Sequence, residues 1–430
     1  MALHRTFRHP VLIVVSTMAI TIAAVLVAFN FIGGEKKIDQ RIERLYALDD
    51  PRFRHELGVL LGPPFIAGNR VTALHNGDEI FPAMLAAIRS AKTSITFETY
   101  IYWAGDIGHE FAEALSERAR DGVKVHVLLD WVGSAKMNEA MLIGMAAAGV
   151  QVRKFHPPHW SNLGRMNNRT HRKVLVVDGR SAFTGGVGIA PPWLGNAQDP
   201  LHWRDSHYQV EGPVVAQMQA VFIDNWIKVT GDVLHGADYF TAPVVAGTAL
   251  AQMFSSSPSG GSESMQLMYL LSITAAARSI DLSAAYFVPD ALATQALTQA
   301  MHRGVRLRIV VPGEHMDSET VRSASRARWG PLLSAGATIA EYAPTMFHCK
   351  VMIVDGLLVS VGSTNFDNRS FRLNDEATLN ILDADFARQQ TAVFNADLGR
   401  SRPITFTEWS QRPWQERLRE RLASLLGSQL

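Results

Sequence analysis

The chain has 430 residues, of which 47% are apolar, so it is long enough to form two domains that each bury a core. Its 41 basic and 40 acidic residues give a formal net charge of +1. This balance argues against a dedicated nucleic-acid binder, which usually carries a strongly basic face. A single cysteine, Cys349, excludes a disulfide framework and a cysteine-based zinc site within one chain.

The first predicted element is an uncharged apolar segment, Val11–Ile32, within residues 1–40. As a helix it would extend about 33 Å, enough to cross the hydrocarbon core of a bilayer. The alternative is a cleaved signal peptide, whose apolar stretch is usually about 7–15 residues and ends in a small-x-small site. Because this segment is longer and ends in AFNFIGGEKK, we expect an uncleaved single-pass anchor. More basic residues follow it than precede it, which favours a cytoplasmic position for the rest of the chain.

The remainder of the chain repeats one order of elements. Ser94–Asp130 predicts a strand near 95–101, a helix near 108–120 and a strand at 123–129, and Ser279–Gly313 has the same pattern. AAGVQVRKFHP is matched by SAGATIAEYAP, and HRKVLVVD is matched by HCKVMIVD. The first copy carries an insertion, His159–Arg169, which predicts either a lid or a solvated loop.

The repeat predicts an α/β fold with two homologous β-α-β units, residues 66–235 and 236–400, whose mixed sheets pack about a pseudo-twofold. The stretch 255–264 predicts a surface loop near the start of the second unit. Residues 401–430 predict an amphipathic tail. Its apolar side chains fall on one helical face, so it predicts either a helix docked on the core or a helix on anionic lipid.

Each copy places three candidate catalytic residues, a histidine, a lysine and an aspartate, around a buried strand: His171, Lys173 and Asp178 in the first, and His348, Lys350 and Asp355 in the second. Side chains alternate along a strand, so each histidine points the same way as the lysine two residues later. A turn of small residues follows each strand, AFTGGVG or VSVGSTN, where backbone N–H groups can hold an anion. The alternative is that these are ordinary residues at the ends of strands. That would explain one copy of the pattern, but it explains two equivalent copies less well.

A pseudo-twofold would bring both sets together as a phosphate site. One neutral imidazole would attack phosphorus and the other, protonated, would donate to the leaving oxygen. The lysines would stabilise the charge on the phosphate oxygens. This chemistry needs no cofactor, and the sequence suggests no cluster of metal ligands.

The two H-x-K-x-x-x-x-D sets, each followed by GGVG or GSTN, resemble the phospholipase D superfamily. Within it, FETYIYW, AAYFVPD and GSTNFDNRSFRLNDE are similar to bacterial cardiolipin synthases. The resemblance covers residues 71–400 and implies a phosphatidyltransferase in a bacterial inner membrane. Its partners would be phospholipids such as phosphatidylglycerol and the bilayer itself, with no nucleic acid.

The resemblance also implies roles for single residues. His171 would be the nucleophile, and His348 would be the acid and then the base. Phosphate would be held by both lysines and by the small-residue turns, through Gly186, Ser363 and Asn365. Asp205 and Glu376 would orient the imidazoles, as carboxylate–histidine pairs do elsewhere. The first unit departs from the pattern, since Gly188 stands where an asparagine is common.

Three residues outside the motifs are weaker candidates. Glu98 would either face the site or be a charge at a strand end, and Tyr100 and Tyr286 would line the site or pack in the core. The same residues allow three other functions: a hydrolytic phospholipase D, a nucleic-acid phosphodiesterase and a non-catalytic lipid-binding protein. The apolar anchor and balanced charge count against the second, and the two complete triplets count against the third.

Overall fold

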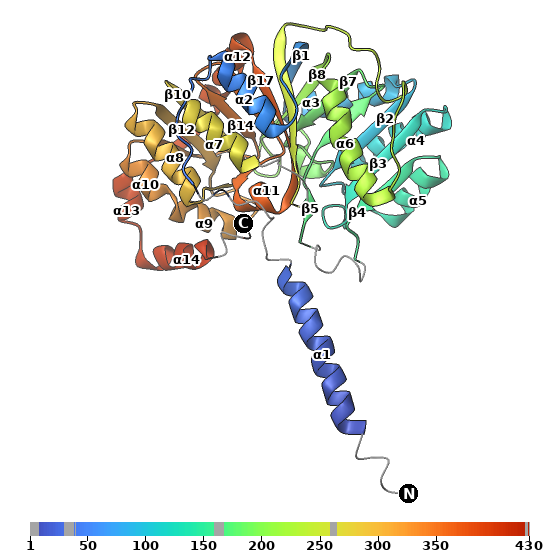
Figure 1. The fold of residues 1–430 in the computed structure, drawn as a ribbon, viewed down its shortest axis with the longest axis horizontal. Coiled ribbons are helices and arrows are strands. Elements are labelled where there is room, and N and C mark those ends of the chain that lie inside the picture. Colours follow the sequence, from blue (N-terminus) through green and yellow to red (C-terminus); the bar gives the residue numbers. More distant parts are fainter. Residues whose placement is uncertain are drawn as a thin grey trace, which may run out of the picture.

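The chain forms a two-unit body and a separate N-terminal helix, α1 (Arg8–Phe29) (Figure 1). The computed structural model describes residues 8–29, 38, 40–158, 167–258, 265–425 and 429, and within α1 the side chains of 12–22, 24 and 25. The apolar side chains described in α1 are exposed, for example Leu12 at 65% and Ile20 at 68%. Among the described residues, none of the helices is long and apolar enough to cross a membrane.

The strands of both units join into one sheet of sixteen strands. The first unit contributes β1 (Ile66–His75), β2 (Ser94–Thr99), β3 (Lys124–Asp130), β4 (Gln151–Phe155), β5 (Arg169–Thr170), β6 (Val174–Val177), β7 (Ser181–Gly185) and β8 (Ser206–Glu211). The second contributes β9 (Ala249–Ser256), β10 (Ser279–Ala284), β12 (Arg306–Pro312), β13 (Thr338–Tyr342), β14 (Lys350–Val354), β15 (Leu358–Gly362), β17 (Asn374–Leu382) and β18 (Ser401–Ile404). A small separate sheet pairs β11 (Phe287–Val288) with β16 (Phe366–Asp367).

The strand order shows the predicted repeat. From one edge it runs β4-β3-β2-β6-β7-β8-β1, and it continues as β9-β17-β15-β14-β10-β12-β13. Each strand of the first half thus has a counterpart at the mirrored place in the second, with the antiparallel pair β1–β9 at the centre. Two pairs in each half are parallel, β2–β3 and β3–β4 in the first and β10–β12 and β12–β13 in the second, whereas β18 adds an antiparallel edge strand to the second half, so the sheet is mixed.

Two sequence-based boundaries are wrong. The predicted loop 255–264 begins too early, because Ser255 and Ser256 are the last residues of β9 and pair with β17. The predicted tail begins too early as well, because β18 pairs with β13 and extends the second half of the sheet past residue 400. Most of the inserted segment, residues 159–166, lies outside the described part of the chain.

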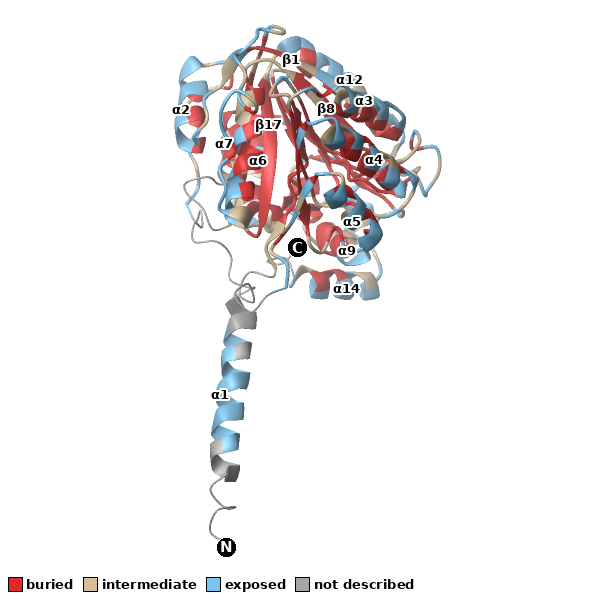
Figure 2. Cartoon of the chain, turned by 90° about the vertical axis from the view of Figure 1, so that its right-hand side faces the viewer, coloured by how far each residue is buried: buried red, intermediate tan, exposed pale blue. Residues whose placement is uncertain are grey.

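Helices cover the buried sheet (Figures 1 and 2). The first unit has α3 (Asn76–Ser90), α4 (Asp106–Arg120), α5 (Glu139–Ala147) and α6 (Val215–Thr230). The remaining helices are α2 (Pro51–Leu61), α7 (Met265–Ala275), α8 (Ala291–His302), α9 (Glu319–Ala327), α10 (Trp329–Ser334), α11 (Asn368–Arg372), α12 (Ala384–Gly399), α13 (Phe406–Ser410) and α14 (Trp414–Ser424). One core cluster contains residues from both units, including Val174, Tyr208, Phe347 and Leu379, so the units share buried apolar packing.

Candidate active site

Main-chain hydrogen bonds between the units hold both repeated histidines in place. His171 N–H donates to the Asp375 carbonyl at 2.8 Å, and His348 N–H donates to the Arg204 carbonyl at 2.8 Å. Asp375 and Arg204 are equivalent, since each directly precedes an orienting carboxylate predicted from the sequence. The histidine of one unit therefore lies beside the carboxylate of the other.

The side chains exchange partners in the same way. His171 Nδ1 lies 2.9 Å and 3.0 Å from the two Glu376 oxygens, and His348 Nδ1 lies 2.7 Å from Asp205 Oδ2. An ionised carboxylate can only accept hydrogen bonds, so each Nδ1 carries the proton and each Nε2 keeps its lone pair. The structure thus brings Asp205 and Glu376 to the two histidines, and each carboxylate contacts the histidine of the opposite unit.

The lysines lie against the histidines. Lys173 Nζ donates to the His171 carbonyl at 2.9 Å, and Lys350 Nζ makes the equivalent bond to the His348 carbonyl at 2.9 Å. Lys350 Nζ is also 3.2 Å from His348 Nε2. All four side chains are more than nine-tenths buried by residue, so their charges interact with little screening by water.

Burial and mutual repulsion set the protonation of these groups. Burial lowers the pKa of the His171 imidazole to about 4, with Lys173 adding to the effect and Glu376 opposing it. Burial, and then Lys350, lower the pKa of His348. Burial and the Lys350 ammonium lower the pKa of Lys173 to about 7. Burial alone would raise the pKa of Glu376, but the His171 imidazole holds it below its ordinary value.

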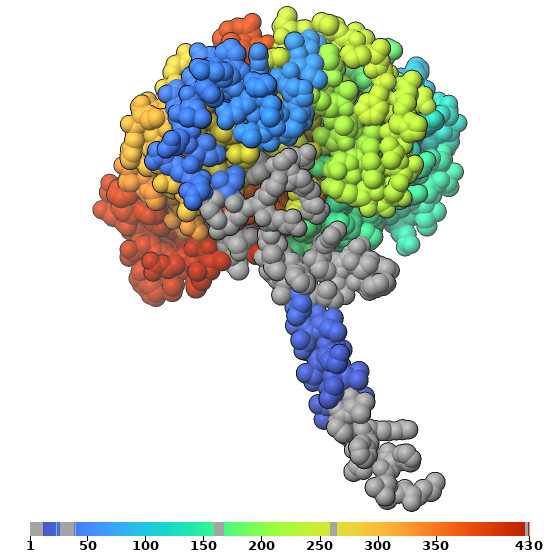
Figure 3. All heavy atoms as spheres, in the orientation of Figure 1, coloured from blue at the N-terminus to red at the C-terminus, as the bar shows by residue number. Residues whose placement is uncertain are grey.

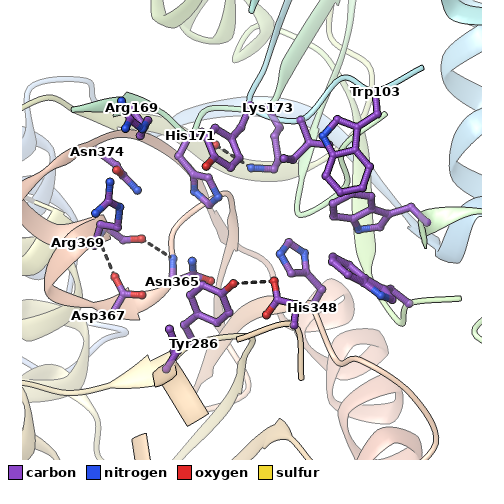
Figure 4. Close-up of a pocket in the computed structure, with 17 residues that line it drawn as sticks. Trp103, Arg169, His171, Lys173, Tyr286, His348, Asn365, Asp367, Arg369 and Asn374 are labelled. Atoms are coloured by element: carbon purple, nitrogen blue, oxygen red, sulfur yellow. Dashed lines mark hydrogen bonds between the residues drawn. The ribbon is translucent and has the colours of Figure 1, made fainter. Parts of the chain in front are cut away.

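Both histidines face one pocket of about 430 Å³ (Figure 4). Near His348 its wall is aromatic, because the Trp193 and Trp203 rings lie 5.3 Å and 5.5 Å from the imidazole. Near His171 the wall is formed by the Tyr100 ring and by a polar set, Arg169, Asp367, Arg369 and Asn374. A pocket built from two similar units is therefore different on its two sides.

One pair of equivalent positions accounts for much of that difference. Trp203 precedes Asp205 by two residues, and Asn374 precedes Glu376 by two residues. Trp203 packs on His348, whereas Asn374 Nδ2 donates to Glu376 Oε1 at 3.2 Å. The sequence predicts a role for neither residue, although each lies two positions before a predicted orienting carboxylate, in WRDSH (203–207) and LNDEA (373–377). Comparing the two segments position by position would have found them.

Asp178 and Asp355, predicted to be catalytic, are not brought to the histidines. Asp178 lies beyond the far end of β6, where its carboxylate accepts hydrogen bonds from the N–H groups of Lys92, Thr93 and Ser94. Asp355 accepts from Ala277, Arg278 and Ser279 in the same way. Both have positive φ, 53° and 55°, in Asp-Gly hairpin turns. They therefore stabilise the turn and the start of the adjacent strand.

Gly186 and Ser363 differ from their predicted role as phosphate ligands. Gly186 N–H already donates to the Ser206 carbonyl at 3.1 Å, and a Cβ there would lie 2.2 Å from Asp205 Oδ1. Ser363 occupies the equivalent position and donates its hydroxyl to Glu376 Oε2 at 2.5 Å. Both residues thus serve the orienting carboxylates, one by leaving space and the other by a hydrogen bond.

Asn365 does line the pocket, and its Oδ1 atom is buried without a hydrogen-bond partner in the part of the chain that the structure describes. At the equivalent position of the first unit, Gly188 stands in place of an asparagine because there is no space for a side chain. A Cβ at Gly188 would lie 2.6 Å from the Ile101 side chain and 3.2 Å from the Trp193 ring. Ile101, with the Trp193 ring beside it, therefore occupies the space that an asparagine would need in the first unit.

The sequence profile described as "Cardiolipin synthase, PLD-like domain" matches residues 84–226 and 269–398, which include both histidine–lysine pairs. This chain belongs to the cardiolipin synthase family. A cardiolipin synthase of Geobacillus kaustophilus is 34% identical over 392 residues, which are 90% of this chain and 78% of that protein. Cardiolipin synthase A of Pseudomonas syringae is 35% identical over 367 residues, 85% of this chain and 76% of the relative.

The fold has a relative among solved structures. A phosphatidylserine synthase of Haemophilus influenzae superposes with a TM-score of 0.64 at 13% identity, over 88% of this chain and 100% of that chain. This likeness shows a shared α/β fold, and the matching profile describes it as PLD-like. Membership of the cardiolipin synthase family makes the protein an enzyme, a phosphatidyltransferase of that type.

Of the three weaker candidates, the two tyrosines line the pocket and the glutamate does not. Tyr100 and Tyr286 both line the pocket, and the Tyr100 ring lies 5.1 Å from the His171 ring. Glu98 does not line it; Glu98 accepts from Asn225 Nδ2 at 2.7 Å, and burial raises its pKa to about 7. In the described ranges, no three histidine, cysteine or acidic side chains are grouped to hold a metal ion.

Proposed function

We propose that this enzyme makes cardiolipin from two molecules of phosphatidylglycerol through a phosphohistidine on His171. The observation that carries the proposal is the exchanged pairing, in which His171–Glu376 and His348–Asp205 face one pocket beside two buried lysines. Such a site offers a neutral nucleophile, a second imidazole for proton transfer and two cations for one phosphate.

In the first half-reaction, His171 Nε2 attacks the phosphorus of phosphatidylglycerol. A nitrogen–phosphorus bond forms, the bond from phosphorus to the headgroup glycerol breaks, and His348 Nε2 gives its proton to the departing oxygen. The pKa of His171, about 4, keeps its lone pair available at neutral pH. A phosphodiester beside Lys173 and His348 would favour their protonated forms, because an anion raises the pKa of nearby cations.

In the second half-reaction, neutral His348 takes the proton from a hydroxyl of a second phosphatidylglycerol. That oxygen attacks phosphorus, the nitrogen–phosphorus bond breaks, and His171 is regenerated. Water competes for the same intermediate, so a transferase must hold the alcohol in place. The aromatic wall of Trp193 and Trp203 supports this role, because it surrounds His348 with apolar surface.

We also propose that α1 anchors the enzyme as a single pass in a bacterial inner membrane, with the body on the cytoplasmic side. The support is the uncharged segment Val11–Ile32, together with the exposed apolar side chains of a helix that projects from the body. An anchor would keep the pocket at a surface where lipid alcohols are concentrated.

Product analysis tests the proposed reaction. Purified full-length protein is incubated, with excess chelator, in vesicles whose only phospholipid is labelled phosphatidylglycerol. Cardiolipin and glycerol in equal amounts should dominate the products, and chelation should not reduce their rate. Phosphatidic acid as the main product would identify a hydrolase, and a rate restored only by an added divalent ion would identify a metal-dependent enzyme.

A further inference from the structure

The C-terminal helix α14 is amphipathic, but its polar side, not its apolar side, faces the body. Its side toward the body carries Glu420, exposed by only 2%, and Ala423. Glu420 accepts hydrogen bonds from Arg326 Nε at 3.1 Å and from Arg412 Nε at 2.7 Å, which ties α14 to α9. Polar and small groups therefore make the contact with the body.

The apolar side chains of α14 point away from the body. Four of them recur at helical spacing and are largely exposed: Trp414 at 62%, Leu418 at 49%, Leu422 at 57% and Leu425 at 74%. At 100° per residue they form one stripe on the side opposite Glu420 and Ala423. A continuous stripe of this kind on a folded protein indicates an interaction surface.

Two arginines border the stripe. Arg417 and Arg421 are exposed, and no carboxylate lies within ion-pair distance of either guanidinium in the described parts of the chain. Both also line a groove of about 520 Å³ that includes Trp414 and Leu418 of the stripe and the paired Arg412 and Glu420. An indole, leucines and unpaired guanidinium groups on one side of a helix fit the boundary between anionic headgroups and acyl chains.

The position of α14 in the body also fits contact with a lipid surface. It lies at the end of the body from which α1 projects, in both perpendicular views (Figures 1 and 2). In the space-filling view its segment forms the lower edge of the body (Figure 3). β5 and α11, which carry the pocket residues Arg169 and Arg369, lie in the same half (Figure 1).

We infer that α14 is a second membrane contact, a helix that lies on an anionic lipid surface and holds the body against it. Trp414, Leu418, Leu422 and Leu425 enter the acyl boundary, and Arg417 and Arg421 contact lipid phosphates. The inference rests on the proposed membrane location of the enzyme but not on its chemistry. With α1, it fixes the body at two points, so the pocket keeps one orientation toward its lipid substrates.

Site-specific labelling tests this contact. Cys349 is the sole cysteine of the sequence and is buried, so a cysteine added at the surface takes a thiol-reactive dye selectively. The labelled variants are Leu418→Cys in α14, Met18→Cys in α1, and Val245→Cys as an exposed apolar control in the segment that crosses the opposite end of the body. Each full-length protein is placed in discs containing brominated phosphatidylglycerol or only brominated phosphatidylcholine.

The label at 418 should be quenched in phosphatidylglycerol discs and much less in phosphatidylcholine discs, while the label at 245 stays unquenched. Adding R417E and R421E should lower the docking equilibrium at least about thirtyfold, since each basic residue lost near an anionic surface costs about 1 kcal/mol and each new carboxylate is repelled. R120E together with R180E is the matched double control, because both arginines are exposed and have no ion pair in the described parts of the chain.

Four outcomes would overturn the inference. A quenched label at 18 with an unquenched label at 418 overturns it and leaves the anchor standing, whereas no quenching at either position overturns both. Equal quenching in the two lipids removes the assignment to anionic headgroups. Burial of the label at 418 without lipid, increasing with protein concentration, would assign the stripe to a second copy of the chain.

Discussion

The aspartates of the two repeated triplets accept hydrogen bonds from backbone N–H groups. Substituting an aspartate should therefore affect stability, whereas substituting a histidine of the same triplet should affect catalysis. Asp178→Ala leaves three N–H groups without their acceptor, so it should lower the free energy of unfolding by about 1–3 kcal/mol. The kcat of the folded variant should stay near that of the unmodified enzyme. His171→Ala should leave the free energy of unfolding nearly unchanged and reduce kcat by several orders of magnitude. Urea titration and initial rates measure both, and a stable but inactive Asp178→Ala protein would restore a catalytic role for Asp178.

Lys173 should set the alkaline limb of the pH profile. Burial and Lys350 lower its pKa to about 7, so the free enzyme loses this ammonium as the pH rises through about 7. Because kcat/KM reports the ionisation of free enzyme, it should fall above that pH. Lys173→Arg keeps its charge and should move the fall to higher pH, even where its absolute rate is lower. An unchanged limb in Lys173→Arg would assign the ionisation to another group.

At the scale of single elements, the turn after β7 must contain a glycine at 186. A methyl group there would lie 2.2 Å from Asp205 Oδ1 and push the carboxylate away from His348. Gly186→Ala should therefore lower kcat by at least about 100-fold, since a misplaced orienting group is costly. Gly144, inside α5 with no atom within 4 Å of an added Cβ, is the control. Gly144→Ala should keep its activity and gain roughly 0.5–1 kcal/mol of stability. Normal kcat in Gly186→Ala would show that Asp205 does not orient His348.

The sequence predicts most of the elements, because alternation and repetition are local signals. The strand expected at 123–129 is β3, Lys124–Asp130, and the helix expected at 108–120 is α4, Asp106–Arg120. The sequence also places His171, Lys173, His348 and Lys350 near one site. The repeated motif predicts a catalytic Asp178, but Asp-Gly between two strands is also a hairpin signal, and the structure places Asp178 in such a turn.

The exchange of carboxylates could not be predicted from the sequence. Asp205 and Glu376 each follow a histidine of their own unit, so spacing alone favours no particular pairing. The pairing depends on how β8 and β17 lie in the common sheet, which is a long-range property. The aromatic wall was missed for the same reason, since Trp193 and Trp203 contact a histidine that follows them by more than 140 residues.

For the whole molecule, the common sheet implies that the two units unfold together. β1 pairs with β9, and the buried Arg204 of the first unit holds Asp397 of the second through bonds of 3.0 Å and 2.9 Å. Calorimetry should show one transition for the body. Asp397→Ala leaves a buried guanidinium unpaired, so it should shift that whole transition downward, by about 3–5 kcal/mol of stability. Two resolved transitions in either protein would mean that the units fold independently.

The exchanged dyads also mean that the site exists only in the complete body, and the proposed mechanism gives each histidine its own role. The most direct measurement is a rapid alkaline quench of enzyme mixed with phosphatidylglycerol labelled in its phosphate, followed by peptide mapping. Label should appear on the peptide containing His171 before cardiolipin forms and should disappear as cardiolipin accumulates. His171→Ala should retain no label. Label on His348, or cardiolipin formed at full rate with no labelled protein at any time, would contradict the proposed mechanism.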